Sequence, residues 1–230
     1  MEIEPIGFLS TCFGEKFAVP RQPGLCPSAW GVLEFAPGYR SPEAVRGLEG
    51  FSHVWLIFGF HKTEDSGWHP TVRPPRLGGN ERVGVFASRS TFRPNGLGLS
   101  LVKLDRISWE TEGGIAPPAL HFSGVDLVDG TPIYDIKPYL PFVEAVPDAA
   151  TGYAADPIER LPVIVEGTAR EDFGKLPVRA QRVICEALSL DPRPAASPKE
   201  DARIHGASLC GKNITFRFAD GACLITGVSG

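Results

Sequence analysis

The sequence predicts a mainly β fold that is followed, at its C-terminal end, by a smaller α+β domain. Short apolar runs alternate with turn-forming residues, because 26 glycines and 22 prolines are scattered along the 230 positions. Only one long stretch, in the last third of the chain, has the apolar spacing of an amphipathic helix. A hydrophobic content of 43% is sufficient to bury a core, so a globular, enzyme-sized protein is expected.

The first part of the chain contains six candidate strands. The run 54–58 is apolar at every position, which is typical of a strand buried inside a barrel or a sandwich. One short helix is expected at 42–48, with Ser41 as its N-cap and Pro42 at its first position. The candidate strands lie at residues 3–10, 32–35, 54–58, 83–87, 99–107 and 120–128.

A change in composition after Phe142 places a domain boundary between residues 147 and 148. Residues 146–153 are small, polar and turn-forming, as in a linker. The tail offers strands at 162–166, 213–218 and 223–226 and a helix at 177–190. One face of that helix carries the apolar residues Ala180, Val183, Ile184, Ala187 and Leu188. The predicted domains are therefore 1–147 and 148–230.

Cysteine usage and the N-terminus indicate a cytoplasmic protein that does not span a membrane. Five cysteines without a C-x-x-C pair argue against a complete disulfide framework. The first residues lack the features of a signal peptide, and no apolar run approaches the roughly 20 residues of a membrane span.

The charge distribution is uneven. A net charge of −4 gives no general sign of nucleic-acid binding, but five arginines lie between residues 73 and 93, opposed only by Glu81. A focused cationic site can therefore coexist with an acidic remainder.

Three loops concentrate residues that packing does not require. The segment 15–24 holds an arginine and an amide between two prolines, which suits a preorganised polar site, although a solvated turn explains it equally well. The segment 89–98 combines arginines with glycines that permit close approach to the backbone. The segment 126–139 places three aspartates and a lysine around an Asp-Gly turn, which either binds a polar ligand or ties down its own backbone.

Common catalytic and metal-binding patterns do not account for these loops. His61 and His69 match no zinc spacing and have no nearby cysteine, so no metal site is expected. The sequence contains no nucleophile elbow, P-loop or H-E-x-x-H pattern. Composition and spacing alone lead to a mostly β enzyme or binding protein with an arginine-rich polar site.

The same loops resemble those of the TsaA-like, or TrmO, family of tRNA threonylcarbamoyladenosine N6-methyltransferases. The resemblance rests on EKFAVPRQPG (15–24), VRGL (45–48), TVRPPRLGGN (71–80), GVFASRSTFRPN (84–95), DLVDGTPIYDIKPYLPF (126–142) and DPRPA (191–195). It implies a small β-barrel methyltransferase domain over 1–147, a homodimer, S-adenosylmethionine as cofactor and tRNA carrying threonylcarbamoyladenosine as substrate. One departure is visible, since the family commonly has RPNPIG where this chain continues from Asn95 with Gly96-Leu97-Gly98.

The resemblance also assigns residues to the site. It implies cofactor contacts at Pro20, Arg21, Gln22, His61, Lys62, Arg89, Leu99, Asp129, Gly130, Thr131 and Pro132. The acceptor nitrogen shares its lone pair with a carbonyl and the purine, so a base should help, and Asp129 or Asp135 is the hypothesis for it. Expected contacts to substrate or RNA are Arg73, Arg76, Arg93, Asn95, Lys137 and Arg193.

Two other functions remain open at this point. One is a non-catalytic RNA- or metabolite-binding module that retains the S-adenosylmethionine pocket. The other is a related barrel methyltransferase with a different small substrate, an alternative that the acidic net charge of −4 keeps open.

Overall fold

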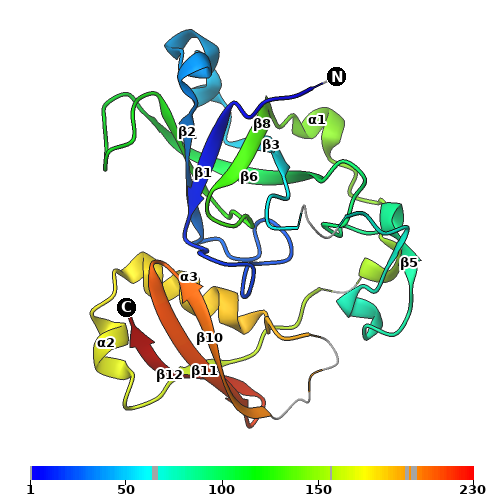
Figure 1. Ribbon diagram of the computed structural model, residues 1–230, viewed down its shortest axis with the longest axis vertical. Helices are drawn as coiled ribbons and strands as arrows, with labels where there is room; N and C mark the ends of the chain where they lie inside the picture. Colours follow the sequence, from blue (N-terminus) through cyan, green and yellow to red (C-terminus); the bar gives the residue numbers. More distant parts are fainter. Residues whose placement is uncertain (1, 64–66, 156, 195–196, 198–200) are drawn as a thin grey trace.

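A closed six-stranded antiparallel β-barrel forms the N-terminal part of the protein. The computed structural model describes residues 2–63, 67–155, 157–194, 197 and 201–230 (Figure 1). Neighbouring strands follow the order β1-β2-β7-β6-β3-β8, and β8 pairs with β1 to close the barrel. The strands are β1 (Gly7–Thr11), β2 (Trp30–Phe35), β3 (His53–Gly59), β6 (Leu97–Ser108), β7 (Ala119–Ser123) and β8 (Thr131–Pro138). The predicted mainly β fold with a barrel domain is confirmed.

Alternating side chains fill the barrel. Leu9, Leu33, Leu56, Leu120 and Ile133 come from five different strands, and all are completely buried. The strand period of two sends every second side chain into this core and leaves the others outside.

Several expectations for the first domain differ from the structure; the strands expected at 3–10 and 120–128, for example, are the shorter β1 and β7. Residues 42–48 form two 3-10 turns, η2 (Pro42–Val45) and η3 (Leu48–Gly50), separated by Gly47 in the left-handed region at φ +83°. Ser41 makes no side-chain cap hydrogen bond within the described residues, so the predicted helix and its N-cap are wrong. The strand expected at 83–87 stops after Gly84 and turns into η6 (Val85–Ala87), and β8 occupies residues read from the sequence as a loop.

A long excursion between β3 and β6 carries the five arginines. It contains a two-stranded sheet of β4 (Thr71–Val72) and β5 (Val83–Gly84), with the 3-10 turn η5 (Pro75–Leu77) between them. Figure 1 shows β5 standing to one side of the barrel. The turn η5 contacts η7 (Gly152–Ala154), so the excursion meets the segment that leads into the C-terminal domain.

The C-terminal domain is a four-stranded mixed sheet covered by a helix. The helix α3 (Val178–Ser189) buries Ala180, Val183, Ile184, Ala187 and Leu188, as the sequence predicts. The strand β10 was not predicted; it contains the exposed Ile204 and a register shift, which obscure its alternation. The sheet order is β10 (Asp201–Leu209), β11 (Lys212–Ala219), β12 (Ala222–Ser229) and β9 (Val163–Val165), with β12 and β9 parallel. Two shorter helices, α1 (Pro141–Glu144) and α2 (Arg170–Gly174), lie on the connections.

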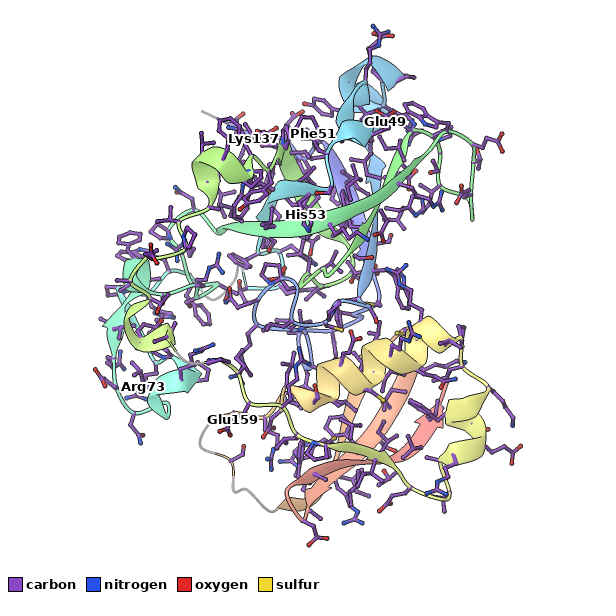
Figure 2. The ribbon with its side chains drawn as sticks, turned by 180° about the vertical axis from the view of Figure 1, so that it is seen from behind. Glu49, Phe51, His53, Arg73, Lys137 and Glu159 are labelled. Atoms are coloured by element: carbon purple, nitrogen blue, oxygen red, sulfur yellow. The ribbon has the colours of Figure 1, made fainter. Side chains whose placement is uncertain are left out.

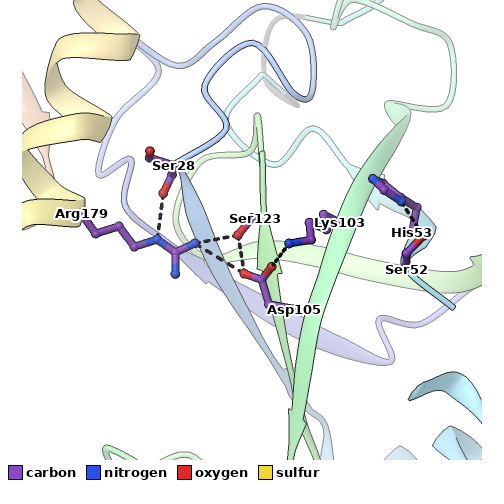
Figure 3. Close-up of polar contacts among 7 residues, drawn as sticks. All are labelled: Ser28, Ser52, His53, Lys103, Asp105, Ser123 and Arg179. Carbon is purple, nitrogen blue, oxygen red and sulfur yellow. Dashed lines mark hydrogen bonds and ion pairs between the residues drawn. The ribbon is translucent and has the colours of Figure 1, made fainter. Parts of the chain in front are cut away.

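Polar contacts join α3 to the barrel. Arg179 donates to the carbonyl of Ser28 at 2.9 Å and to Ser123 Oγ at 2.8 Å, and lies 3.6 Å from Asp105, which also pairs with Lys103 (Figure 3). Two turns further along α3, the Glu186 carboxylate accepts hydrogen bonds from the Ser28 amide at 2.9 Å and hydroxyl at 2.8 Å. These contacts hold α3 between the barrel and the C-terminal sheet.

No helix among the described residues is long and apolar enough to cross a membrane.

Candidate active site

A cleft of about 2070 Å³ opens at one end of the barrel. Its walls come from the N-terminal loop, the end of β3, the arginine-bearing excursion, the start of β6, the β7–β8 connection and the interdomain segment. Pockets for one small ligand occupy roughly 300–1,000 Å³, so this cleft has room for two ligands in contact.

The three loops singled out in the sequence meet in this cleft. Arg21 and Gln22 line it from the first loop, and Arg89 lines it from the second. The Arg89 guanidinium donates a hydrogen bond to Gln22 Oε1, which ties these two loops together. Arg21 donates to the carbonyl of Arg193 at 3.1 Å, so the C-terminal domain also fixes the first loop.

The end of β3 and the start of β6 form the side of the cleft next to the barrel. His61 and Lys62 follow β3, and the Lys62 carbonyl accepts a hydrogen bond from Lys16 at 3.1 Å. Leu99, on β6, lines the cleft and leaves about half of its side chain exposed (49%). The site therefore combines an apolar surface with several cationic groups.

The Asp-Gly turn contributes mainly through its backbone geometry. The Asp129 carboxylate accepts a hydrogen bond from the Thr11 amide at 2.8 Å, and Gly130 adopts φ +77°. Thr131 donates to the Val128 carbonyl at 2.6 Å, and it is the member of the group 129–132 that lies among the described cleft residues. Pro132 is buried on β8. The turn therefore fixes the start of β8 beside the cleft.

Asp126 is a cleft residue that the sequence analysis did not select. Its Oδ1 accepts a hydrogen bond from Ser100 Oγ at 2.7 Å, and both side chains line the cleft. Burial raises the pKa of the Asp126 carboxyl to about 6, although the Ser100 bond and the charge of Arg89 oppose this rise. The sequence does indicate that Asp126 is partly buried, because it lies between the apolar residues Val125 and Leu127.

All five arginines of the excursion line the cleft. The Arg93 guanidinium donates to the carbonyls of Val85 at 3.2 Å and Ser88 at 2.9 Å, so it also organises its own loop. Arg82 donates to Thr71 Oγ1 at 2.9 Å across the small sheet. Arg73 is exposed on the same cleft. The cationic cluster expected from the sequence is therefore gathered on one wall.

Like Asp129, Gly130 and Pro132, four further predicted site residues are not among the described cleft residues. Asp135 and Lys137 are exposed on β8, where they pair with Ile57 and Trp55, and Figure 2 shows Lys137 far from Arg73 and Glu159. Asn95 is exposed in the loop before β6.

Arg193 is buried, with 6% of its surface exposed. Its guanidinium bonds to both Asp191 carboxylate oxygens at 2.8 Å and lies 3.6 Å from the centre of the Phe218 ring. This position favours a structural role over contact with RNA. The resembling element 191–195 ends at Ala195, which lies outside the described residues.

Comparison with known proteins decides the family. Residues 8–145 match the tRNA-methyltransferase O N-terminal domain, and residues 158–230 match the TrmO C-terminal domain. The chain belongs to the TrmO family. The predicted division between residues 147 and 148 falls in the interval between the two matches.

Close relatives of this TrmO-family chain match along nearly its whole length. The tRNA (adenine(37)-N6)-methyltransferase of Escherichia coli K12 is 46% identical over 224 residues, covering 95% of this chain and 94% of the relative. A putative S-adenosylmethionine-dependent methyltransferase, RcsF, from Pseudomonas aeruginosa PAO1 is 44% identical over 211 residues, covering 90% of this chain and 88% of the relative. The crystal structure of TrmO from Pseudomonas aeruginosa superposes with a TM-score of 0.81 at 36% identity, covering 100% of this chain and 98% of that chain.

Backbone hydrogen bonds stabilise the loop at Gly96, where this chain departs from the TrmO-family pattern. Gly96 adopts φ +58°, and its amide donates to the Arg93 carbonyl at 3.1 Å. The Gly96 carbonyl accepts a hydrogen bond from the Phe60 amide at 2.8 Å, which joins the loop to the end of β3. Proline can neither adopt this φ nor donate that bond, so this chain uses a different turn at this position.

Among the residues that the structure describes, no group of three or more His, Cys, Asp or Glu side chains is arranged to hold a metal ion.

Proposed function

We propose that this protein transfers a methyl group from S-adenosylmethionine to the N6 nitrogen of adenine 37 in tRNA. The observation that carries the proposal is the meeting of three family loops in one cleft that is large enough for a cofactor and a nucleoside. The Escherichia coli relative, named as a tRNA (adenine(37)-N6)-methyltransferase, supports the same reaction. The finer part of the proposal is that the accepted adenine carries a threonylcarbamoyl group.

The described cleft residues fit S-adenosylmethionine. Leu99 and Pro20 offer apolar surface for an adenine ring, and the tied pair Arg89 and Gln22 offers donors and an acceptor for the amino-acid end. When bound, the cofactor supplies a methyl group on a cationic sulfur. We propose that its contacts are Pro20, Arg21, Gln22, His61, Lys62, Arg89, Leu99 and Thr131, and that Asp129, Gly130 and Pro132 act by holding the turn.

Arginines of the excursion are proposed to receive the RNA. A threonylcarbamoyl group carries a carboxylate, and a guanidinium can bind a carboxylate through two parallel hydrogen bonds. Arg73 suits this role because its side chain is exposed and lines the cleft. Arg76 and Arg93 extend the same wall, and Asn95 and Lys137 are proposed as contacts to more distant parts of the tRNA.

Radiolabelled methyl transfer tests the function directly. The substrates are one tRNA with and without the threonylcarbamoyl group, and the enzymes are the unsubstituted protein, Arg73→Ala and the control Arg46→Ala, which is exposed outside the cleft. We expect Arg73→Ala to lose about tenfold to hundredfold of the preference for modified tRNA, since a charged hydrogen bond contributes about 1.5–3 kcal/mol. The control should keep the preference.

Three results of this assay would contradict parts of the proposal. Equal weakening toward both tRNAs would assign Arg73 to phosphate binding. Cofactor binding without any methyl transfer would indicate a non-catalytic binding module. Transfer to a small acceptor but to neither tRNA would indicate a related methyltransferase with another substrate.

We further propose that the protein is a homodimer and acts in the cytoplasm, where its tRNA substrate is found. Support for the dimer comes from an exposed apolar patch on and beside α1. Phe142 is 83% exposed, Val143 62% and Val146 67%, and grouped apolar side chains of this kind mark interaction surfaces. Sedimentation should show that Phe142→Glu shifts the protein toward monomer, whereas Val178→Glu, on the exposed side of α3, should not. A monomeric unsubstituted protein would refute the dimer.

A further inference from the structure

The environment of Asp126 differs from that of the other carboxylates near the cleft. It lies on the β7–β8 connection between Val125, which is completely buried, and Leu127, which is 3% exposed. Ser100, which donates to it at 2.7 Å, is itself only 2% exposed on β6. The carboxylate therefore lies between apolar neighbours, accepts hydrogen bonds from the Ser100 hydroxyl and from its own backbone amide, and borders the cleft.

The alternative carboxylates are less suited to chemistry in the cleft. Asp129 is bonded to the Thr11 amide at 2.8 Å, and Asp135 is exposed on β8 outside the set of described cleft residues. Glu159 lines the cleft but is exposed on the interdomain segment. Asp126 is thus the partly desolvated carboxylate on the cleft wall formed by the barrel.

We propose that Asp126 is the catalytic residue that accepts the proton from the adenine N6 nitrogen, with Ser100 as its positioning residue. The proposal rests on the proposed function. In the balanced step, Asp126 gains the proton, the nitrogen lone pair forms the new bond to the methyl carbon, and the carbon–sulfur bond breaks with its electron pair passing to sulfur. A neutral carboxylic acid, a methylated nitrogen and a neutral thioether result.

The chemistry of the acceptor explains the need for such a group. The N6 lone pair is delocalised into the purine, and into a carbonyl when threonylcarbamoyl is present, so the nitrogen becomes nucleophilic only as its proton leaves. A general base works best when its pKa lies near the working pH, and burial raises the pKa of Asp126 to about 6. At neutral pH the group is mostly ionised and still basic enough to take a proton.

The surrounding groups set how Asp126 titrates. Arg89 is the charged side chain whose field acts on it, and the Ser100 hydroxyl stabilises its ionised form; both lower its pKa. Arg21, His61 and Lys62 line the same cleft from the N-terminal loop and the end of β3. Removing the Ser100 hydroxyl should therefore raise the pKa of Asp126.

Single-turnover methylation across pH 4.5–9 tests the assignment. In the unsubstituted protein the rate should rise with pH through the pKa of Asp126, and in Ser100→Ala this inflection should move to higher pH. Asp126→Asn should slow transfer by about 10²- to 10⁴-fold, the usual contribution of a general base, and should keep its affinity for S-adenosylmethionine within threefold. The matched control Asp220→Asn, in the β11–β12 turn, should behave like the unsubstituted protein, because asparagine tolerates the left-handed φ of +52° there.

A second readout does not depend on turnover. The ¹³C shift of the Asp126 carboxyl should titrate at the pH of the kinetic inflection, and Ser100→Ala should move both in the same direction. Full activity in Asp126→Asn, or an inflection unchanged in Ser100→Ala, would overturn the assignment. Loss of cofactor binding in Asp126→Asn would assign Asp126 to binding. A failure of the proposed function would be distinguishable from a failure of this assignment, because the unsubstituted protein would then transfer no methyl group to tRNA.

Discussion

Replacing Gly96 by proline would restore the residue common in the family, and the structure predicts that it destabilises this protein. Gly96 has φ +58°, whereas proline is fixed near −65° and lacks the amide that donates to Arg93 at 3.1 Å. The lost hydrogen bond costs about 1 kcal/mol, and rearranging the turn also disturbs the bond from Phe60 to the Gly96 carbonyl, about 1 kcal/mol more. Loss of the left-handed conformation destabilises the folded state by about 1–2 kcal/mol more. Proline also lowers the conformational entropy of the unfolded chain, which offsets up to about 1 kcal/mol of this loss. The net expectation is a loss of about 2–3 kcal/mol.

Urea unfolding followed by circular dichroism measures this loss, and Gly96→Ala separates its two causes. Alanine keeps the amide, and its Cβ would meet no described atom within 4 Å, so it should lose only about 1 kcal/mol from the left-handed φ. Because Leu97 and Leu99 line the cleft just after this turn, Gly96→Pro should also weaken binding of S-adenosylmethionine more than Gly96→Ala does. If Gly96→Pro were as stable as the unsubstituted protein, the assigned turn geometry would be refuted.

Three further predictions concern stability and packing. Arg193→Met should lower the unfolding free energy by about 1.5–3 kcal/mol in urea, because it removes the charged hydrogen bonds to Asp191 and the guanidinium that lies over the Phe218 ring; unchanged stability would contradict the structural role of Arg193. Asp126→Asn should stabilise the protein at pH 8 by up to about 3 kcal/mol. The pKa of Asp126 rises from 3.8 to about 6 on folding, so the folded state binds the proton more tightly than the unfolded state does. The stability of the unsubstituted protein therefore falls as the pH rises through that interval. Thermal unfolding should show this gain disappearing near pH 4, and a gain independent of pH would refute the linkage. Gly98→Ala should cost about 1–3 kcal/mol in urea unfolding, because its Cβ would approach the Phe58 ring to 2.3 Å, and a neutral result would show that this ring is free to move.

Local patterns anticipated the elements whose formation depends on neighbouring residues in the chain. The apolar spacing of 177–190 predicted α3, and the Asp220-Gly221 turn predicted the β11–β12 hairpin, since both residues adopt the left-handed conformation that such a turn requires. The expected helix at 42–48 failed because Gly47 interrupts it, although Pro42 suits a helix start. The strand β10 was missed because a register shift and an exposed isoleucine break its alternation.

The aspartates of the segment 126–139 show where sequence reasoning stops. Asp126, Asp129 and Asp135 are chemically identical and lie within ten positions, yet one lines the cleft, one binds the backbone of β1 and one faces outward on β8. The pairing of β8 with β3 decides the place of Asp135, whereas hydrogen bonds from Ser100 on β6 and from Thr11 on β1 fix Asp126 and Asp129.

The sequence by itself determined the mainly β character, the family and the rigid loops that carry the arginines, because these depend on local patterns and on motifs of adjacent residues. Only the tertiary structure decided which of these residues share the cleft. It brought Gln22 to Arg89 and Ser100 to Asp126, and it buried Arg193 against Phe218. Such contacts join residues far apart in the chain, so they depend on strand register and packing between elements, which no local pattern encodes.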